Sequence, residues 1–161
     1  MSLYQYIKDS KKEPSPELNE LFRGRIIEWR NDIASVRIER PTRLDKARAL
    51  GYKPKQGIII IRQRVERGGR LREKIRHARR TKHSGRRKDV DKNYQWIAEE
   101  RANKKHINCE VLNSYYVAED GNYLWYEVIL VDRTHPVIVN DKSINWICEQ
   151  RGRVKRGLTL A

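Results

Sequence analysis

The sequence predicts an α+β fold, in which helices pack on a mostly antiparallel sheet and a long extended basic segment leaves this core. Three observations support the prediction. Residues 111–132 consist of two β-rich runs around an Asp-Gly pair, which is typical of an antiparallel hairpin. Apolar residues recur at helical spacing between residues 18 and 29. The positive charge is concentrated in one part of the 161-residue chain.

The N-terminal residues predict two helices. Ser2 and Gln5 have capping-box spacing, and the short helix that they open is expected to bury Tyr4 or Ile7. The dipeptide Ser15-Pro16 supplies an N-cap and a first helical residue for a second, amphipathic helix. The apolar stripe of this second helix, which is expected to run to about Arg30, consists of Leu18, Leu21, Phe22, Ile26 and Trp29.

A strand, a short helix and a second strand are expected next. Residues 34–40 alternate like a half-buried strand, which ends at Pro41. A short helix follows, capped by Thr42 and stopped by Gly51. Residues 57–69 begin as a fully buried strand, alternate further on, and end at the pair Gly68-Gly69.

The second half of the chain predicts a helix and a hairpin. The helix is expected from about Asn93 to Lys105, with Tyr94, Ile97, Ala98 and Ala102 toward the core. The hairpin that follows is expected to close with a two-residue type I′ turn at Asp120-Gly121. This turn would pair Val117 with Leu124, Tyr115 with Tyr126 and Val111 with Leu130, all on one core face.

Tyr116, Tyr123 and Trp125 fall on the other face of the predicted hairpin. Exposed aromatic residues on a sheet can stack on bases of RNA. A helix that covers this face is the interpretation that we favour, because the chain has several helices that need a sheet to pack on.

The net charge of +15 lies in residues 41–88. These 48 residues include 18 basic and 3 acidic ones (18 − 3 = 15), whereas the other 113 residues include 18 of each sign. Arg70–Lys88 alone contains ten Lys and Arg among nineteen residues. A cationic block of this kind indicates nucleic acid or an anionic membrane as the partner.

A membrane is excluded as that partner by the apolar content of the sequence. The longest apolar candidate is Gly57–Ile61, which is far shorter than the eighteen or so residues that a spanning helix requires. Between Arg70 and Lys88 only Leu71 and Ile75 are bulky and apolar, which is too few for a helix lying on a membrane surface. We therefore expect nucleic acid as the partner.

The sequence contains no motif that indicates catalysis or metal binding. The four histidines lack HxH or HExxH spacing, and the motifs of P-loops and of serine hydrolases are absent. Cys109 and Cys148 are far apart, and we expect reduced core thiols in a cytosolic protein. We expect no enzymatic activity, no cofactor, no metal and no small-molecule substrate.

The basic segment has the composition of an RNA-binding arm. Ten of the thirteen cations from Arg62 to Lys88 are Arg, which grips phosphates bidentately and stacks on bases. Because like charges repel, Arg70–Lys88 should be extended and mobile until a polyanion surrounds it. We expect the arm at about residues 62–92, inserted between a strand and a helix of one domain, residues 1–161, that is monomeric when free.

Cations outside the arm are expected to meet the same RNA. The short helix after Pro41 should bury Leu44, Ala47 or Leu50 and present its cations, although a plain connector between two strands is the alternative. The residues predicted to bind RNA are Arg40, Arg43, Lys46, Arg48, Lys53, Lys55, Arg62, Arg64, Arg67, Arg70, Arg72, Lys74, Arg76, Arg79, Arg80, Lys82, Arg86, Arg87, Lys88, Arg151, Arg153, Lys155 and Arg156.

Several long stretches resemble a known family. They are "EWRNDIASVRIERP" and "RPTRLDKARALGYKPKQG" in residues 28–57, "RVERGGR" in residues 64–70, and "AEERANKKHINCEVLNSYYVAEDGNYLWYEVILVD" in residues 98–132. With His135-Pro136 and "RGLT" in residues 156–159, the likeness covers nearly the whole chain. The sequence is similar to the archaeal and eukaryotic fifteen-e family of large-subunit ribosomal proteins.

The resemblance implies a function that fits the charge pattern. Members of this family bind large-subunit ribosomal RNA, lie in the cytoplasmic ribosome beside other ribosomal proteins, and have no enzymatic activity. They join an α+β domain to basic segments threaded into RNA, and usually continue beyond "RGLT" into a basic tail, whereas this sequence ends at Ala161. An RNA chaperone acting off the ribosome is the alternative function, and an RNA-processing nuclease is a third.

Overall fold

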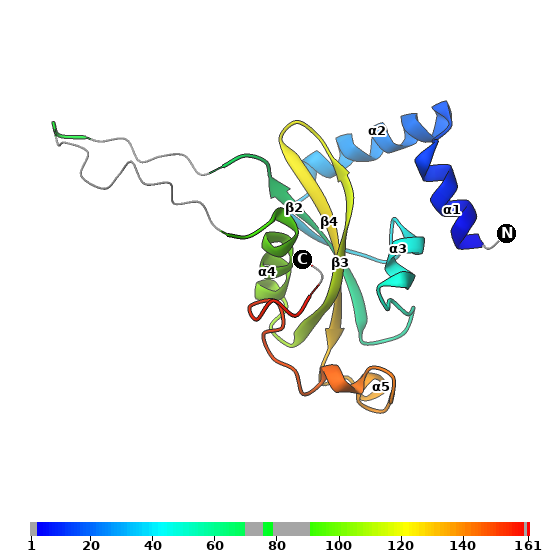
Figure 1. Cartoon of the computed structure of the whole chain (residues 1–161), viewed down its shortest axis with the longest axis vertical. Coiled ribbons are helices and arrows are strands. Elements are labelled where there is room, and N and C mark those ends of the chain that lie inside the picture. The colour runs from blue at the N-terminus through cyan, green and yellow to red at the C-terminus, as the bar shows by residue number, and fades with distance from the viewer. Residues whose placement is uncertain (1–2, 70–75, 79–90, 160) are drawn as a thin grey trace.

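The computed structural model of the chain describes residues 3–69, 76–78, 91–159 and 161. Most of the predicted arm, residues 70–75 and 79–90, therefore lies outside the described residues. The prediction that this arm is mobile in the free protein lies there too. Figure 1 shows the arrangement of the elements that flank it.

A four-stranded antiparallel sheet forms the centre of the molecule. Its strands are β1 (Ser35–Ile38), β2 (Ile58–Glu66), β3 (Cys109–Glu119) and β4 (Tyr123–Asp132), in the order β1-β2-β4-β3. In β4, which lies between β2 and β3, the eight residues from Leu124 to Val131 are all buried. Side chains of successive strand residues point to opposite faces, so both faces of the sheet must be covered.

Helices supply most of this cover. Figure 1 shows α3 and α4 on opposite sides of the sheet, with α1 and α2 at one end and α5 at the other. The predicted α+β fold with a mostly antiparallel sheet is therefore confirmed. The helices are α1 (Leu3–Lys12), α2 (Pro16–Asn31), α3 (Leu44–Ala49), α4 (Tyr94–Lys105) and α5 (Pro136–Val139), with a 3₁₀ turn η1 (Asn145–Ile147). None of the helices within the described residues has the length and apolar character needed to cross a membrane.

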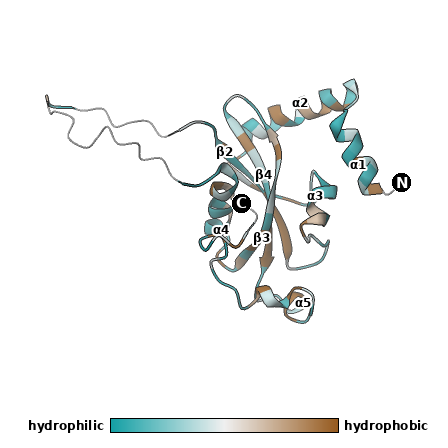
Figure 2. Cartoon of the chain, in the orientation of Figure 1, coloured by the Kyte–Doolittle hydropathy of each residue, from teal (hydrophilic) through white to brown (hydrophobic). Residues whose placement is uncertain are grey.

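The core is divided by the sheet into two sides. On one side, Ile60 and Ile129 pack with residues of α3, α5 and η1, among them Ile138. On the other side, Ile61 and Leu130 pack with residues of α4 and of the C-terminal segment. The strands are accordingly the most hydrophobic part of the chain, while α1 is mainly hydrophilic (Figure 2).

The N-terminal helices form where the sequence predicts them. Ser15 caps α2, and its side chain accepts a hydrogen bond from the Leu18 amide at 3.3 Å. The predicted apolar stripe of α2 is only partly buried, because α2 extends past the edge of the sheet (Figure 1) and buries only Trp29 near its C-terminal end. In α1, Ile7 is half-buried and Tyr4 is exposed, and the predicted cap Ser2 lies outside the described residues.

The predicted cap of α3 is wrong. The helix begins at Leu44 after Arg43, which makes no side-chain capping bond. Thr42 lies one residue too early, and its amide donates instead to the Glu127 carboxylate at 3.0 Å. The predicted end is confirmed, since Gly51 follows the helix with a φ of +95°.

The structure also confirms the strand and helix that flank the arm. Strand β2 begins fully buried and alternates toward Glu66, while β1 is shorter than predicted and ends at Ile38. Asn93 caps α4 by accepting from the Trp96 amide at 2.7 Å, and Ala98 and Ala102 are buried as expected. The two cysteines are free thiols, with Cys109 buried and Cys148 half-buried.

The hairpin turn differs from the prediction by one residue. Asp120 and Tyr123 form the closing pair, with the Asp120 amide donating to the Tyr123 carbonyl at 2.9 Å. Gly121 lacks the positive φ that a type I′ turn requires. The Asp120 carboxylate accepts instead from the amides of Asn122 and Tyr123, at 2.8 and 2.6 Å, so the side chain of Asp120 organises the turn.

The register of the hairpin is likewise only partly as predicted. Val111 pairs with Leu130, but β-bulges between Val111 and Asn113 and between Tyr116 and Ala118 each insert one residue into β3. Two predicted pairs are therefore wrong: Tyr126 faces Tyr116 rather than Tyr115, and Leu124 faces Glu119 rather than Val117.

The bulges also change the faces of the hairpin. Tyr115 and Val117 pack with the Ile60 side of the core, opposite to Val111, Leu124, Tyr126 and Leu130. The predicted common face for these six residues is therefore wrong. A single extra residue reverses every side chain that follows, since the side-chain period of a strand is two.

Buried carboxylates join remote parts of the fold. Glu127 in β4 is fully buried and accepts hydrogen bonds from the Thr42 amide and the Tyr115 hydroxyl. Burial raises the pKa of Glu127, although these donors oppose the shift. Glu127 thereby holds the β1–α3 connection against the sheet.

Glu99 and Glu110 hold the C-terminal segment in the same manner. Glu99 in α4 is fully buried and accepts from the hydroxyls of Ser114 and Thr159, the latter at 2.6 Å. Glu110 in β3 accepts from the amides of Gly152 and Arg153 at 2.8 and 3.2 Å. Sequence patterns treat these acids as surface residues, so their burial is a finding of the structure.

We predict that Gly57→Ala destabilises the protein by about 2–4 kcal/mol, because two costs add. Gly57 has a φ of +84°, and a Cβ there would lie 2.6 Å from Ile138 Cγ1 in α5. Gly24→Ala in α2 is the control, since its added Cβ would meet no atom within 4 Å beyond its chain neighbours and the backbone of its own helix. That change should stabilise the protein by about 0.5–1 kcal/mol. Equal urea midpoints for the two variants would contradict the assigned contact.

We also predict that Glu99→Gln stabilises the protein relative to wild type more at pH 7 than at pH 4. Burial raises the pKa of Glu99, so its contribution to stability is complete below the unfolded pKa and is lost as the pH rises through the folded value. Glutamine cannot ionise. Its amide oxygen can still accept from one hydroxyl partner, and the other hydroxyl can turn to accept from its NH2 group.

Asp141→Asn is the control, because its stability relative to wild type should change with pH in the opposite direction. Hydrogen bonds from Lys55 and Ser143 lower the pKa of Asp141, so its contribution is present above the unfolded pKa and is lost as the pH falls. Urea unfolding from pH 3 to pH 8 measures both variants. A stability difference between Glu99→Gln and wild type that does not change with pH would refute the assignment.

Candidate nucleic-acid interface

The cations of β2 lie at the base of the predicted arm and are engaged inside the fold. The Arg62 guanidinium lies 4.4 Å from the ring centroid of Trp29 and 2.7 Å from the Asp32 carboxylate. The side chain of Arg62 is 12% exposed. Arg62 therefore joins the C-terminal end of α2 to the sheet.

A row of aromatic rings continues from this contact. Trp29 and Trp125 have ring centroids 6.1 Å apart, and Trp125 and Tyr123 have theirs 6.0 Å apart. The Arg64 guanidinium lies 4.6 Å from the Tyr123 ring. The prediction that a helix covers this face is confirmed for Trp125, which is 1% exposed beneath Trp29 of α2. Cation–π contacts of this kind are strongest where water is excluded.

Tyr116 does not belong to this row. The β-bulges place it beside Tyr126, with ring centroids 6.0 Å apart, and it remains 39% exposed. The predicted grouping of Tyr116 with Tyr123 and Trp125 is therefore wrong.

Further hydrogen bonds hold the end of β2 against the hairpin turn. Arg64 donates to the Arg30 carbonyl at 2.6 Å, and Arg67 donates to the Asp120 carbonyl at 2.9 Å. Arg30 in turn pairs with the Asp120 carboxylate at 2.7 Å. These contacts fix the direction in which the chain leaves the sheet after Glu66.

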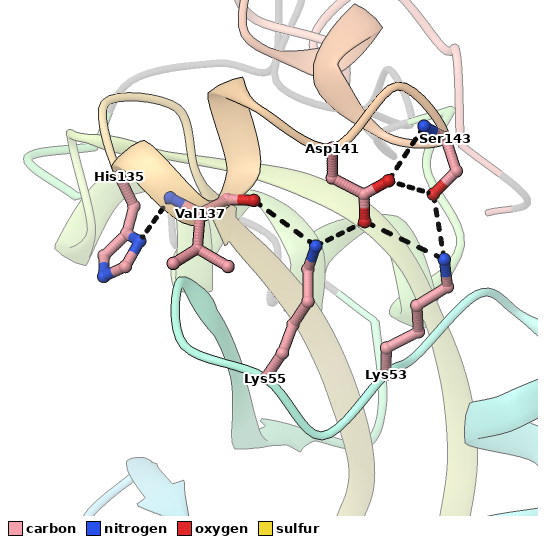
Figure 3. A network of polar contacts seen from close by, with 6 residues as sticks. All are labelled: Lys53, Lys55, His135, Val137, Asp141 and Ser143. Carbon is pink, nitrogen blue, oxygen red and sulfur yellow. Dashed lines mark hydrogen bonds and ion pairs between the residues drawn. The ribbon is translucent and has the colours of Figure 1, made fainter.

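The loop between α3 and β2 carries a second set of engaged cations. Figure 3 shows Lys53 and Lys55 converging on Asp141, which follows α5. Lys55 pairs with the Asp141 carboxylate and donates to the Val137 carbonyl at 3.4 Å, and Lys53 donates to the Ser143 hydroxyl at 2.8 Å. The Asp141 carboxylate also accepts from the Ser143 amide and hydroxyl. This network fixes the loop that precedes β2.

Arg43 is also held within the protein. It pairs with Asp45 at 3.1 Å, and its side chain is 21% exposed. Hydrogen bonds from Arg43 and the Lys46 amide outweigh the effect of burial and lower the pKa of Asp45. Arg43 thus differs from its neighbours Lys46 and Arg48, which lie exposed on α3 while Ala47 between them is fully buried.

The predicted RNA-binding residues therefore fall into three groups. Those that form hydrogen bonds or ion pairs with protein groups are Arg43, Lys53, Lys55, Arg62, Arg64, Arg67, Arg153 and Arg156. Those that lie exposed and are not among these eight are Arg40, Lys46, Arg48, Arg76, Arg151 and Lys155. Those outside the described residues are Arg70, Arg72, Lys74, Arg79, Arg80, Lys82, Arg86, Arg87 and Lys88.

The exposed group has the character of an electrostatic interface. Lys and Arg side chains free to move in solvent can meet phosphates without first breaking an internal ion pair. Within the described parts of the chain, no three His, Cys, Asp or Glu side chains are placed to hold a metal ion. Sequence reasoning overlooked Trp146, an exposed indole with Arg153 over its ring at 4.8 Å. The position of Trp146 shortly before four C-terminal cations was the sequence signal that could have identified it.

Comparison with known proteins places the chain among ribosomal proteins. The family model described as Ribosomal L15 matches residues 2–161. The protein named large ribosomal subunit protein eL15 from Nanoarchaeum equitans is 53% identical over 161 residues, which cover 99% of this chain and 85% of the relative. Proteins of the same name from Methanospirillum hungatei and Methanocella arvoryzae are each 51% identical, over 99% of this chain and 84% of the relative.

We predict that the double variant Lys46→Ala/Arg48→Ala binds structured RNA several-fold more weakly but keeps its thermal midpoint. Both side chains are exposed, so their loss removes charge and leaves packing intact. Arg62→Ala should do the reverse and cost about 2–4 kcal/mol of stability, because Asp32 loses its partner and Trp29 its cation.

Thermal melts and filter binding of the same preparations measure both effects. Stability loss in the α3 variant with unaltered RNA affinity would show that α3 is a connector and no part of the interface.

Proposed function

The chain belongs to the ribosomal L15 family, and from this membership we propose that it binds and stabilises large-subunit ribosomal RNA during assembly and translation. It is a structural protein of the large ribosomal subunit, located in the cytoplasmic ribosome, and not an enzyme. Its proposed partners are this RNA and neighbouring large-subunit proteins.

The distribution of charge is the observation that carries the proposal. Residues 41–88 hold the whole net charge of +15, and the other 113 residues are neutral in sum. In the described part of this segment, the cations of β2 and of the α3–β2 loop pair with protein groups, whereas Lys46 and Arg48 are exposed. Phosphate contact is the role that we propose for the exposed cations and for those of residues 70–88.

The residue types favour structured RNA over a loosely bound polyanion. Ten of the thirteen cations from Arg62 to Lys88 are Arg. The guanidinium group binds phosphate bidentately and stacks on bases, whereas a Lys ammonium acts as a point charge. The internal contacts of Arg62, Arg64 and Arg67 support this proposal indirectly, because they anchor the base of the arm to the sheet.

We predict a steep dependence of RNA affinity on salt. Each phosphate neutralised by Lys or Arg releases condensed counterions, so about eight such contacts give a log–log slope of roughly −6 to −7. Deleting Arg70–Lys88 should flatten this slope, while the remaining protein still unfolds cooperatively. Replacing the arginines of this segment with lysines should keep most of the slope but lower the affinity for structured ribosomal RNA.

Titrations of a large-subunit ribosomal RNA fragment at several salt concentrations measure these slopes. A slope near zero for the intact protein would reject the arm as the interface. Retention on large subunits through a high-salt wash separates a ribosomal constituent from an RNA chaperone that acts elsewhere.

A further inference from the structure

Trp146 is exposed although the apolar residues nearest to it in the chain, Ile144 and Ile147, are buried. It lies in η1 with 43% of its surface exposed, whereas Ile144, two residues earlier, and Ile147, which follows it, are 5% and 0% exposed. The other tryptophans of the chain are buried or half-buried, with Trp29 and Trp125 at 6% and 1%. Since Trp is highly buried on average, an exposed indole on a rigid turn requires a specific explanation.

One side of this indole is already covered by a cation. The Arg153 guanidinium lies 4.8 Å from the ring centroid of Trp146. Protein groups hold Arg153 in place, because its Nε donates to the Val111 carbonyl at 3.0 Å and its Nη2 to the Leu158 carbonyl at 2.8 Å. The exposed surface of Trp146 therefore belongs to a fixed Arg–Trp pair.

The C-terminal turn that carries Arg153 is itself anchored. Glu110 accepts from the Gly152 and Arg153 amides, Val154 is 2% exposed, and the Leu158 amide donates to the Arg153 carbonyl at 3.0 Å. Because the turn is already ordered, a ligand that binds there loses little conformational entropy of the protein. The site is therefore preorganised for binding.

The sequence around the pair is rich in positive charge. Residues 145–156 contain four cations and one acid, Glu149. Arg151, Lys155 and Arg156 are all exposed. A ligand that suits this surface has a flat π-system and a negative charge close to it, as a nucleotide of single-stranded RNA does.

We propose that Trp146 is a stacking site for one unpaired base of RNA, with Arg153 beneath the indole and the neighbouring cations on the adjacent phosphates. The inference rests on the proposed RNA-binding function and adds a site distant from the predicted arm. The stacked base is read through its π-face, so the site tolerates any base but requires that it is unpaired.

The test compares two RNA probes of equal charge. One is a single-stranded adenine dodecanucleotide, and the other is the same sugar-phosphate chain without bases. Trp146→Leu should weaken binding of the adenine probe about tenfold and leave binding of the abasic probe unchanged. Trp146→Phe, which keeps an aromatic ring, should retain most of the affinity.

Tyr6→Leu is the matched control variant. Tyr6 is 69% exposed on α1, far from the C-terminal turn in Figure 1, so its loss removes an exposed aromatic residue without touching the site. The affinity for both probes should stay at the wild-type value. Because Trp146 is exposed, its variants should also keep the wild-type thermal midpoint.

Tryptophan emission gives a readout that a structural role would not change. The adenine probe should quench the emission of the wild-type protein, and Trp146→Phe should abolish this quenching. The abasic probe should quench neither protein.

Unchanged affinity of Trp146→Leu for the adenine probe would overturn the proposal. If the RNA affinity of the protein still fell steeply with salt, the RNA-binding function would remain intact. Absence of binding to both probes and to ribosomal RNA would instead reject the proposed function itself. A variant that binds the adenine probe normally but fails to enter large subunits would assign Trp146 to a protein contact and likewise overturn the stacking site.

Discussion

The burial of β4 on both faces is the constraint on which the rest of the structure depends. Its eight central residues are all removed from water between β2 and β3, so each face of the sheet needs its own cover. The chain provides α4 and the C-terminal segment on one side and α3, α5 and η1 on the other. Even the short elements after β4 are therefore part of the core.

The burial of the sheet also accounts for the hydrogen bonding of the three internal carboxylates. Glu127 lies within β4 itself, and Glu99 and Glu110 lie where the C-terminal segment crosses α4 and β3. A buried carboxylate is tolerated only where hydrogen-bond donors replace the lost water. Each of these acids accepts from groups remote in sequence, so the cost of burial is offset by contacts that fasten otherwise irregular segments.

The cations of the protein divide by location into those that hold the fold together and those that are exposed to solvent. Arg62 and Arg64 complete the row of rings that attaches α2 to the sheet, and Lys53 and Lys55 fix a loop through Asp141. Lys46 and Arg48 on α3, and Arg151 and Lys155 near Trp146, are exposed to solvent. A basic protein of the ribosome thus uses part of its charge to hold its own fold and presents another part outward.

The sequence by itself determined the elements that depend on local chemistry. Ser15 and Asn93 cap their helices, Gly51 ends another, and the segregation of charge predicts the RNA partner. The tertiary structure alone decided the bulges of β3, the incomplete burial of the apolar stripe of α2 and the internal role of Arg62, whose partner Asp32 is 30 residues away. Local propensity acts between neighbours in the chain, whereas strand register and ion pairing depend on which distant surfaces must be buried together.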